Sequence, residues 1–159
     1  MRHLKSLLVV CCLASQAAAS QAPAGSAGAS AGACSFLTRE LAMKVSGAAN
    51  KAVFDLPPEE EPAGKGSACH YADITLQIDP FTAERLEQLR KAQGKDWVEV
   101  PGVGDAAYFR DNGNRFAELY GRVGPRTFTI QLGVPFQGTA EGMKPNAITL
   151  AQAIVPRMR

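Results

Sequence analysis

Residues 97–132, WVEVPGVGDAAYFRDNGNRFAELYGRVGPRTFTIQL, decide the fold of this chain, because strand-like runs and turn signals alternate along them. Four runs favour strands: residues 97–100, 106–110, 115–120 and 127–132. Three runs favour turns: residues 101–105, 111–114 and 121–125. Strands that are joined by such tight turns form an antiparallel meander.

The flanking sequence adds one strand and several helices. Residues 74–78 alternate between apolar and polar side chains, which predicts a strand with one buried face. Three segments predict helices: 35–45 with Thr38 or Ser35 as the cap, 82 to about 93, and 146–155. Residues 57–67 are expected to form an exposed loop. We therefore predict an α+β fold, order α-β-α-β-β-β-β-α, with one antiparallel sheet of about five strands packed against about three helices.

The N-terminus predicts export. Residues 1–19 combine the basic residues Arg2 and Lys5, an apolar run at 7–13 and small residues at 17–19, as in a secretory signal peptide. The run is much shorter than the roughly 20 residues of a membrane-spanning helix, so we expect no stable membrane insertion. The alternative is a buried N-terminal helix. A periplasmic or secreted location follows from the signal peptide.

Two regions should follow the predicted cleavage site after Ala19. Residues 20–33 contain only Ala, Ser, Gln, Gly and Pro, and such a stretch is expected to remain a flexible tail. Residues 34–159 are expected to form a single domain, because the whole chain of 159 residues is too short for two well-cored domains.

The net positive charge of the chain comes from its predicted signal peptide. The sequence has 17 Lys plus Arg, 15 Asp plus Glu and a net charge of +2. Removing Arg2 and Lys5 with the signal peptide leaves 15 basic residues against the 15 acidic ones. A neutral mature protein gives no electrostatic reason to expect a nucleic-acid partner.

Cys34 and Cys69 are the only cysteines outside the predicted signal peptide. In an oxidising compartment two cysteines favour an intramolecular disulfide, which here would close a loop of about 36 residues. Redox activity or metal binding is the weaker interpretation, since there is no C-x-x-C pair and His70 is the single histidine of the mature chain.

No motif predicts a cofactor, a metal or a defined catalytic site. Residues 102–105 contain two glycines but lead into a strand rather than a helix, unlike a phosphate-binding loop. Residues 59–61 and 111–114 carry oxygen ligands but suit a charged loop and a turn better than a metal site. A small hydrolase would have to use His70, with Ser67 and Asp73 as its nearest candidate partners.

Aromatic residues offer a different kind of site. Tyr71, Trp97, Tyr108 and Tyr120 lie on predicted strands, and on one exposed face they would form a recognition surface. Packing in the core is the alternative for most of them.

Four short motifs form a common frame: Cys34-Ser35-Phe36-Leu37-Thr38, Cys69-His70-Tyr71, the run from Val100 to Tyr108, and Leu150-Ala151. On these motifs the chain resembles a group of small exported bacterial envelope domains of unknown function that are related to lipoproteins. Many members carry a lipid, but neither Cys11 nor Cys12 follows a small residue, so the resemblance does not imply an anchor here. It implies an exported domain without catalytic residues.

These observations lead to four functional hypotheses. Two of them are non-enzymatic binding proteins: an envelope protein that binds another envelope protein, and a small-ligand carrier, which should have a concave pocket. A close variant of the first is a periplasmic inhibitor or immunity protein that uses residues 57–65 or 136–144. The alternative of a different class is a small hydrolase that uses His70.

Overall fold

The computed structural model describes residues 31–84, 86–87, 91, 97–113, 115–135 and 137–159. Its centre is a seven-stranded sheet of order β1-β2-β3-β7-β6-β5-β4 in which every neighbouring pair is antiparallel. The strands are β1 (Glu59–Ala63), β2 (Gly66–Tyr71), β3 (Ile74–Pro80), β4 (Trp97–Glu99), β5 (Ala106–Asp111), β6 (Phe116–Val123) and β7 (Arg126–Gly133).

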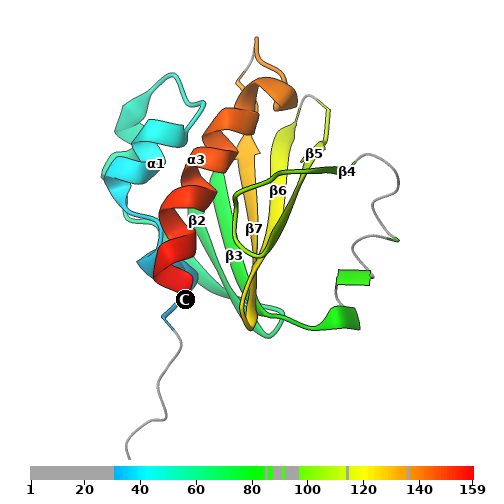
Figure 1. Ribbon diagram of the computed structural model, residues 1–159. Helices are drawn as coiled ribbons and strands as arrows, with labels where there is room; N and C mark the ends of the chain where they lie inside the picture. Colours follow the sequence, from blue (N-terminus) through cyan, green and yellow to red (C-terminus); the bar gives the residue numbers. More distant parts are fainter. Residues whose placement is uncertain (1–30, 85, 88–90, 92–96, 114, 136) are drawn as a thin grey trace, which may run out of the picture.

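The helices α1 (Arg39–Val45) and α3 (Ala140–Met158) lie across one face of this sheet (Figure 1). Two short 3₁₀ helices, η1 (Ala33–Ser35) and η2 (Lys51–Asp55), flank α1 in the chain. Thr38 caps α1 by accepting the N–H of Leu41, and Thr139 caps α3 by accepting the N–H of Gly142. No helix in the described ranges has the length and apolar character needed to cross a membrane.

The fold is α+β, but the predicted counts of about five strands and about three helices are wrong. The sheet has seven strands, and α1 and α3 are the α-helices that lie wholly within the described ranges. Half of the predicted helix from residue 82 to about 93 lies outside the described residues, and residues 83–84, 86–87 and 91 have helical backbone. The last helix begins at Ala140, six residues before the predicted start.

The expected loop at residues 57–67 is instead a hairpin made by β1 and the start of β2. Gly64 and Lys65 form a two-residue turn between the paired residues Ala63 and Gly66, and Gly64 has a φ of 58°. A positive φ at the first turn position matches the tight turns that favour the twist of paired strands. The three glutamates of β1 hid this strand, because charges suit an edge strand and weaken the usual strand signal.

The core lies between the sheet and the two helices. One row of register partners crosses five strands and is fully buried: Cys69, Leu76, Ile130, Leu119 and Phe109. From α3, Leu150, Ala151 and Ile154 are 0% exposed. We refer to this side as the helix face and to the opposite side of the sheet as the distal face.

The start of the domain is fixed to the sheet and to the last helix. Cys34 and Cys69 form the predicted disulfide, with their Cα atoms 4.8 Å apart. The N–H of Ala33 donates to Oγ of Ser67 over 2.8 Å, and the Arg157 guanidinium donates to the carbonyl of Phe36 over 3.0 Å. These bonds hold the segment around η1 in place from two sides.

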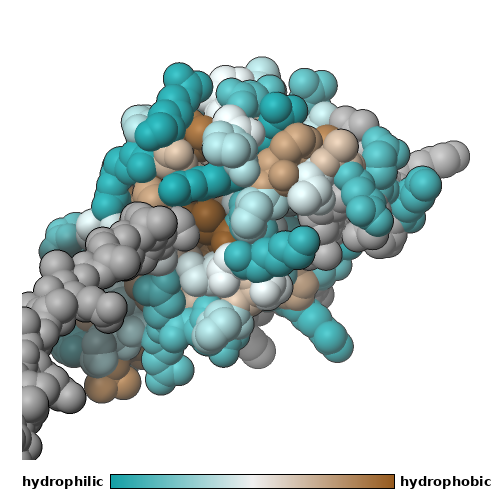
Figure 2. All heavy atoms as spheres, turned by 90° about the horizontal axis from the view of Figure 1, so that it is seen from below, coloured by the Kyte–Doolittle hydropathy of each residue, from teal (hydrophilic) through white to brown (hydrophobic). Residues whose placement is uncertain are grey.

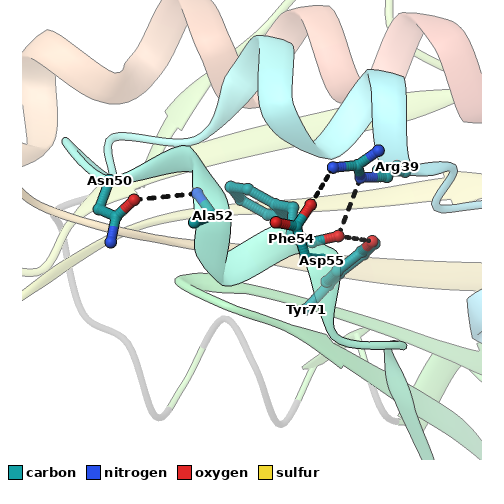
Figure 3. A network of polar contacts seen from close by, with 6 residues as sticks. All are labelled: Arg39, Asn50, Ala52, Phe54, Asp55 and Tyr71. Carbon is teal, nitrogen blue, oxygen red and sulfur yellow. Dashed lines mark hydrogen bonds and ion pairs between the residues drawn. The ribbon is translucent and has the colours of Figure 1, made fainter.

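A polar network attaches η2 to the neighbouring elements (Figure 3). Arg39 of α1 forms an ion pair with Asp55 and donates from Nε to the carbonyl of Phe54 over 3.0 Å. Tyr71 of β2 donates to the same carbonyl over 2.8 Å, and its ring meets the Phe54 ring edge-on at 5.1 Å. Asn50 caps η2. Tyr71 therefore packs on the helix face of the sheet, where it contacts η2.

Candidate functional site

The four aromatic residues of the predicted recognition surface do not share one face. Tyr71 is 5% exposed and lies on the helix face. Trp97, Tyr108 and Tyr120 lie on the distal face, where Tyr108 and Tyr120 are direct register partners. Tyr120 is 4% exposed, whereas Trp97 and Tyr108 are partly exposed. The structure thus brings together three of the four residues and leaves two with accessible surface.

A row of polar side chains crosses the distal face. Its members are register partners on six adjacent strands: His70, Thr75, Gln131, Glu118, Arg110 and Trp97. At one end Arg110 forms an ion pair with the buried Glu118 and stacks on Trp97, with 5.3 Å between the guanidinium carbon and the ring centroid. This end is a packed structural cluster, because burial of Glu118 requires the charge of Arg110.

The other end of the row contains His70 with two partners. Its Nε2 lies 2.9 Å from Oε1 of Glu61, and its Nδ1 lies 3.2 Å from Oγ1 of Thr75. The side chain of His70 is 42% exposed and that of Glu61 is 63% exposed. A carboxylate, an imidazole and a hydroxyl therefore stand in hydrogen-bonding sequence on β1, β2 and β3.

Ser67 and Asp73, the partners that the sequence suggested for His70, form hydrogen bonds with other residues. Oγ of Ser67 accepts the N–H of Ala33. The Asp73 carboxylate accepts the hydroxyl of Ser46 over 2.5 Å and the N–H of Gly47 over 2.9 Å. The observed partner Thr75 could have been found by pairing the strands across a turn at residues 72–73, which sets His70 opposite Thr75.

A hollow lies at the end of the sheet where the β1–β2 and β6–β7 hairpins turn. It consists of two adjoining cavities of about 420 and 260 Å³ that share Lys65, Asp79 and Pro80. The larger is also lined by Ile78, Pro125, Arg126, Glu60, Ser67 and Gly32, among others. We call both cavities together the hairpin-end recess. Figure 2 views the molecule from this end and shows hydrophobic surface surrounded by hydrophilic side chains.

Two glycines and their turns shape this recess. A Cβ on Gly66 would stand 1.7 Å from the carbonyl oxygen of Ile78, so only glycine permits the close approach of β2 to β3 there. Gly124, with a φ of 54°, opens the two-residue turn between β6 and β7 and directs Pro125 into the lining. The recess is therefore a product of backbone geometry as much as of its side chains.

The recess combines an apolar surface with five charged side chains. Lys65 and Arg126 supply two cations, and Glu60, Asp79 and Glu84 supply three carboxylates. Oδ2 of Asp79 accepts the amide of Gln77 over 2.6 Å. Within the described ranges neither cation has a hydrogen bond or ion pair of its own. Unpaired cations beside apolar surface can receive a polar group of a ligand.

The loops that an immunity protein would use are only partly loops. Residues 57–65 contain β1, and Ala140 to Lys144 already belong to α3, while Phe136 lies outside the described residues. No group of three or more His, Cys, Asp or Glu side chains in the described part of the chain is placed to hold a metal ion. Oδ1 of Asp111 accepts the N–H of Gly113 over 2.7 Å, as in a turn.

Comparison with known proteins adds no relative to this description. A scan against protein-family models, a search of curated proteins and a search of solved structures each found no match.

Proposed function

We propose that this chain is an exported envelope protein that binds a small ligand in the hairpin-end recess. The recess itself is the observation that carries the proposal, because a concave pocket is the feature that separates a ligand carrier from a protein-binding surface. Its larger cavity, about 420 Å³, falls within the roughly 300–1,000 Å³ of typical small-molecule sites. Export rests on the predicted signal peptide and agrees with the disulfide.

The lining supports a ligand with an apolar body and a charged end. Ile78, Pro80 and Pro125 offer apolar surface, while Arg126 and Lys65 offer cationic groups for an acidic oxygen. The carboxylates of Glu60 and Asp79 in the same lining would favour a ligand that also carries a positive or hydrogen-donating group. A zwitterionic or amphipathic small molecule suits this combination best.

The test is to identify what the protein carries and whether the recess holds it. The mature protein is purified from the envelope fraction of cells and analysed by native mass spectrometry, and the molecule recovered is added back in a thermal-shift titration. We expect a concentration-dependent rise in Tm for the wild type. Arg126→Glu should weaken binding at least tenfold, since it reverses a charge in the lining.

Arg115→Glu is the matched control, because Arg115 is an exposed cation that lines neither cavity. Equal weakening by both variants would contradict binding in the recess. Recovery of a protein that carries no small molecule, together with no thermal shift from a library of zwitterionic and amphipathic compounds, would contradict the function.

A further inference from the structure

We propose that Glu61, His70 and Thr75 form a hydrolytic centre on the distal face that acts on small esters through an acyl-threonine intermediate. The three side chains stand in the order carboxylate, imidazole, hydroxyl. The two contacts, 2.9 and 3.2 Å, lie within the roughly 2.6–3.2 Å over which a nucleophile, its base and the group orienting that base are linked.

The contact to Glu61 determines which nitrogen of His70 can act as a base. A neutral imidazole carries its proton on one nitrogen and accepts with the other. A carboxylate only accepts, so a proton on Nε2 is directed to Glu61 and Nδ1 is left as the acceptor toward the Thr75 hydroxyl. Glu61 is thus a positioning residue, and His70 and Thr75 are the catalytic residues.

The sheet fixes the relative places of these groups. His70 and Thr75 are direct register partners on β2 and β3, and Glu61 lies on β1 in the strand beside β2. Rigid strands hold a constellation more accurately than loops do. The 42% exposure of the His70 side chain leaves room for a small substrate to approach from solvent.

The reaction balances without a cofactor. Thr75 Oγ1 attacks the carbonyl carbon of the ester while its proton passes to Nδ1 of His70. The bond to the leaving oxygen breaks, and the alcohol takes that proton. Water then attacks the acyl-threonine, its proton passes through Nδ1 to Thr75, and the acid is released. Gln131, the register partner of Thr75 on β7, offers a side-chain amide on the same face as a donor for the developing oxyanion.

The centre is independent of ligand binding in the hairpin-end recess. None of Glu61, His70 and Thr75 lines either cavity. An experiment on the distal face therefore fails or succeeds without deciding what the recess binds.

The test measures turnover of 4-nitrophenyl acetate by the disulfide-bonded mature protein, with peptide mass spectrometry of acid-quenched samples. We expect an acetyl group on Thr75 during turnover. His70→Ala and Thr75→Ala should each lower kcat/KM about 100-fold. Thr75→Ser should retain turnover, since it keeps the hydroxyl. Glu61→Gln should lower kcat with little change in KM, because it affects the orientation of His70 rather than substrate binding.

Thr129→Ala is the control, since Thr129 is a partly exposed threonine on the distal face without a contact to His70. Circular dichroism and Tm verify that each variant is folded. Turnover that survives Thr75→Ala, or the absence of an acetyl group on Thr75 in the wild type, would overturn the proposal. Loss of turnover in Thr129→Ala as large as that in Thr75→Ala would do the same.

Discussion

At the scale of single residues, Gly66 is required because there is no space for a side chain, and not because of its backbone conformation. A Cβ at Gly66 would overlap the backbone carbonyl oxygen of Ile78 at 1.7 Å, so Gly66→Ala must push β2 away from β3. We expect a loss of about 1–3 kcal/mol in the free energy of unfolding, as for other overpacked sites. Urea denaturation of the wild type and the variant measures it.

Gly113→Ala serves as the comparison for Gly66→Ala. Gly113 has a φ of 69° but no atom within 4 Å of its Cβ position, so alanine there meets backbone strain without overlap. We expect a cost of about 1 kcal/mol for that strain. A loss at Gly113 as large as the loss at Gly66 would mean that the β2–β3 contact is not the reason for glycine at residue 66.

The turn between β2 and β3 explains why the contact of His70 with Thr75 was not predicted. Ala72 and Asp73 connect the paired residues Tyr71 and Ile74, and Ala72 adopts a φ of 54°. Alanine is an unusual residue for this conformation, so the sequence lacks the Asn-Gly type of signal that marks a hairpin. Asp73 stabilises this region through Ser46 and Gly47, a long-range contact that local patterns do not predict.

At the scale of elements, the segments with clear strand signals were predicted as strands, and β1, which lacks such signals, was not. The four runs found in residues 97–132 correspond to β4, β5, β6 and β7, because apolar residues on strands and glycine-containing turns mark them clearly. β1 has the sequence EEEPA and no apolar alternation, and among the described strands it pairs with β2 alone. Tertiary pairing with β2, rather than local propensity, makes this segment a strand.

Pro62 gives edge strand β1 a protective role that can be tested. Ala63 and Gly66 flank a two-residue turn and so form a hydrogen-bonded pair, which directs the backbone N of Pro62 away from β2. Proline there removes a donor from the open edge and hinders pairing with another chain. We expect Pro62→Val to increase self-association, measured by sedimentation velocity over a range of concentrations.

Ala63→Val is the control for Pro62→Val, since it adds an apolar side chain to the same strand without adding an outward N–H. An increase in self-association with Ala63→Val alone would point to the side chain rather than to the edge. An unchanged sedimentation profile for Pro62→Val would show that proline does not protect β1.

At the scale of the whole molecule, the chain is two meanders joined in the middle. β1, β2 and β3 form one, β4 to β7 form the other, and the pairing of β3 with β7 makes them a single sheet. Helix α3, from the end of the chain, packs across this sheet and holds the start of the domain through Arg157. Contacts between residues far apart in the sequence close long loops and therefore cost chain entropy. A covalent link near one end of the domain should therefore add to its stability.

The disulfide provides that link, and its removal should lower the stability of the whole domain. Cys34 and Cys69 are 35 positions apart, and the loop-entropy account assigns such a bridge about 3–4 kcal/mol. We expect Cys34→Ser with Cys69→Ser to lower the free energy of unfolding in urea by this amount. The double variant avoids a free thiol, and the wild type in reductant should show a similar loss.

Arg157→Ala tests whether the noncovalent attachment of the same segment contributes as well. Its guanidinium donates to carbonyls of Ser35 and Phe36, so its removal should destabilise the domain by about 1–2 kcal/mol while the disulfide is intact. Because the disulfide and Arg157 hold one segment, their effects should not be additive in the triple variant. Additive losses would mean that the two ends of the chain are stabilised independently, and that the segment around η1 does not connect them.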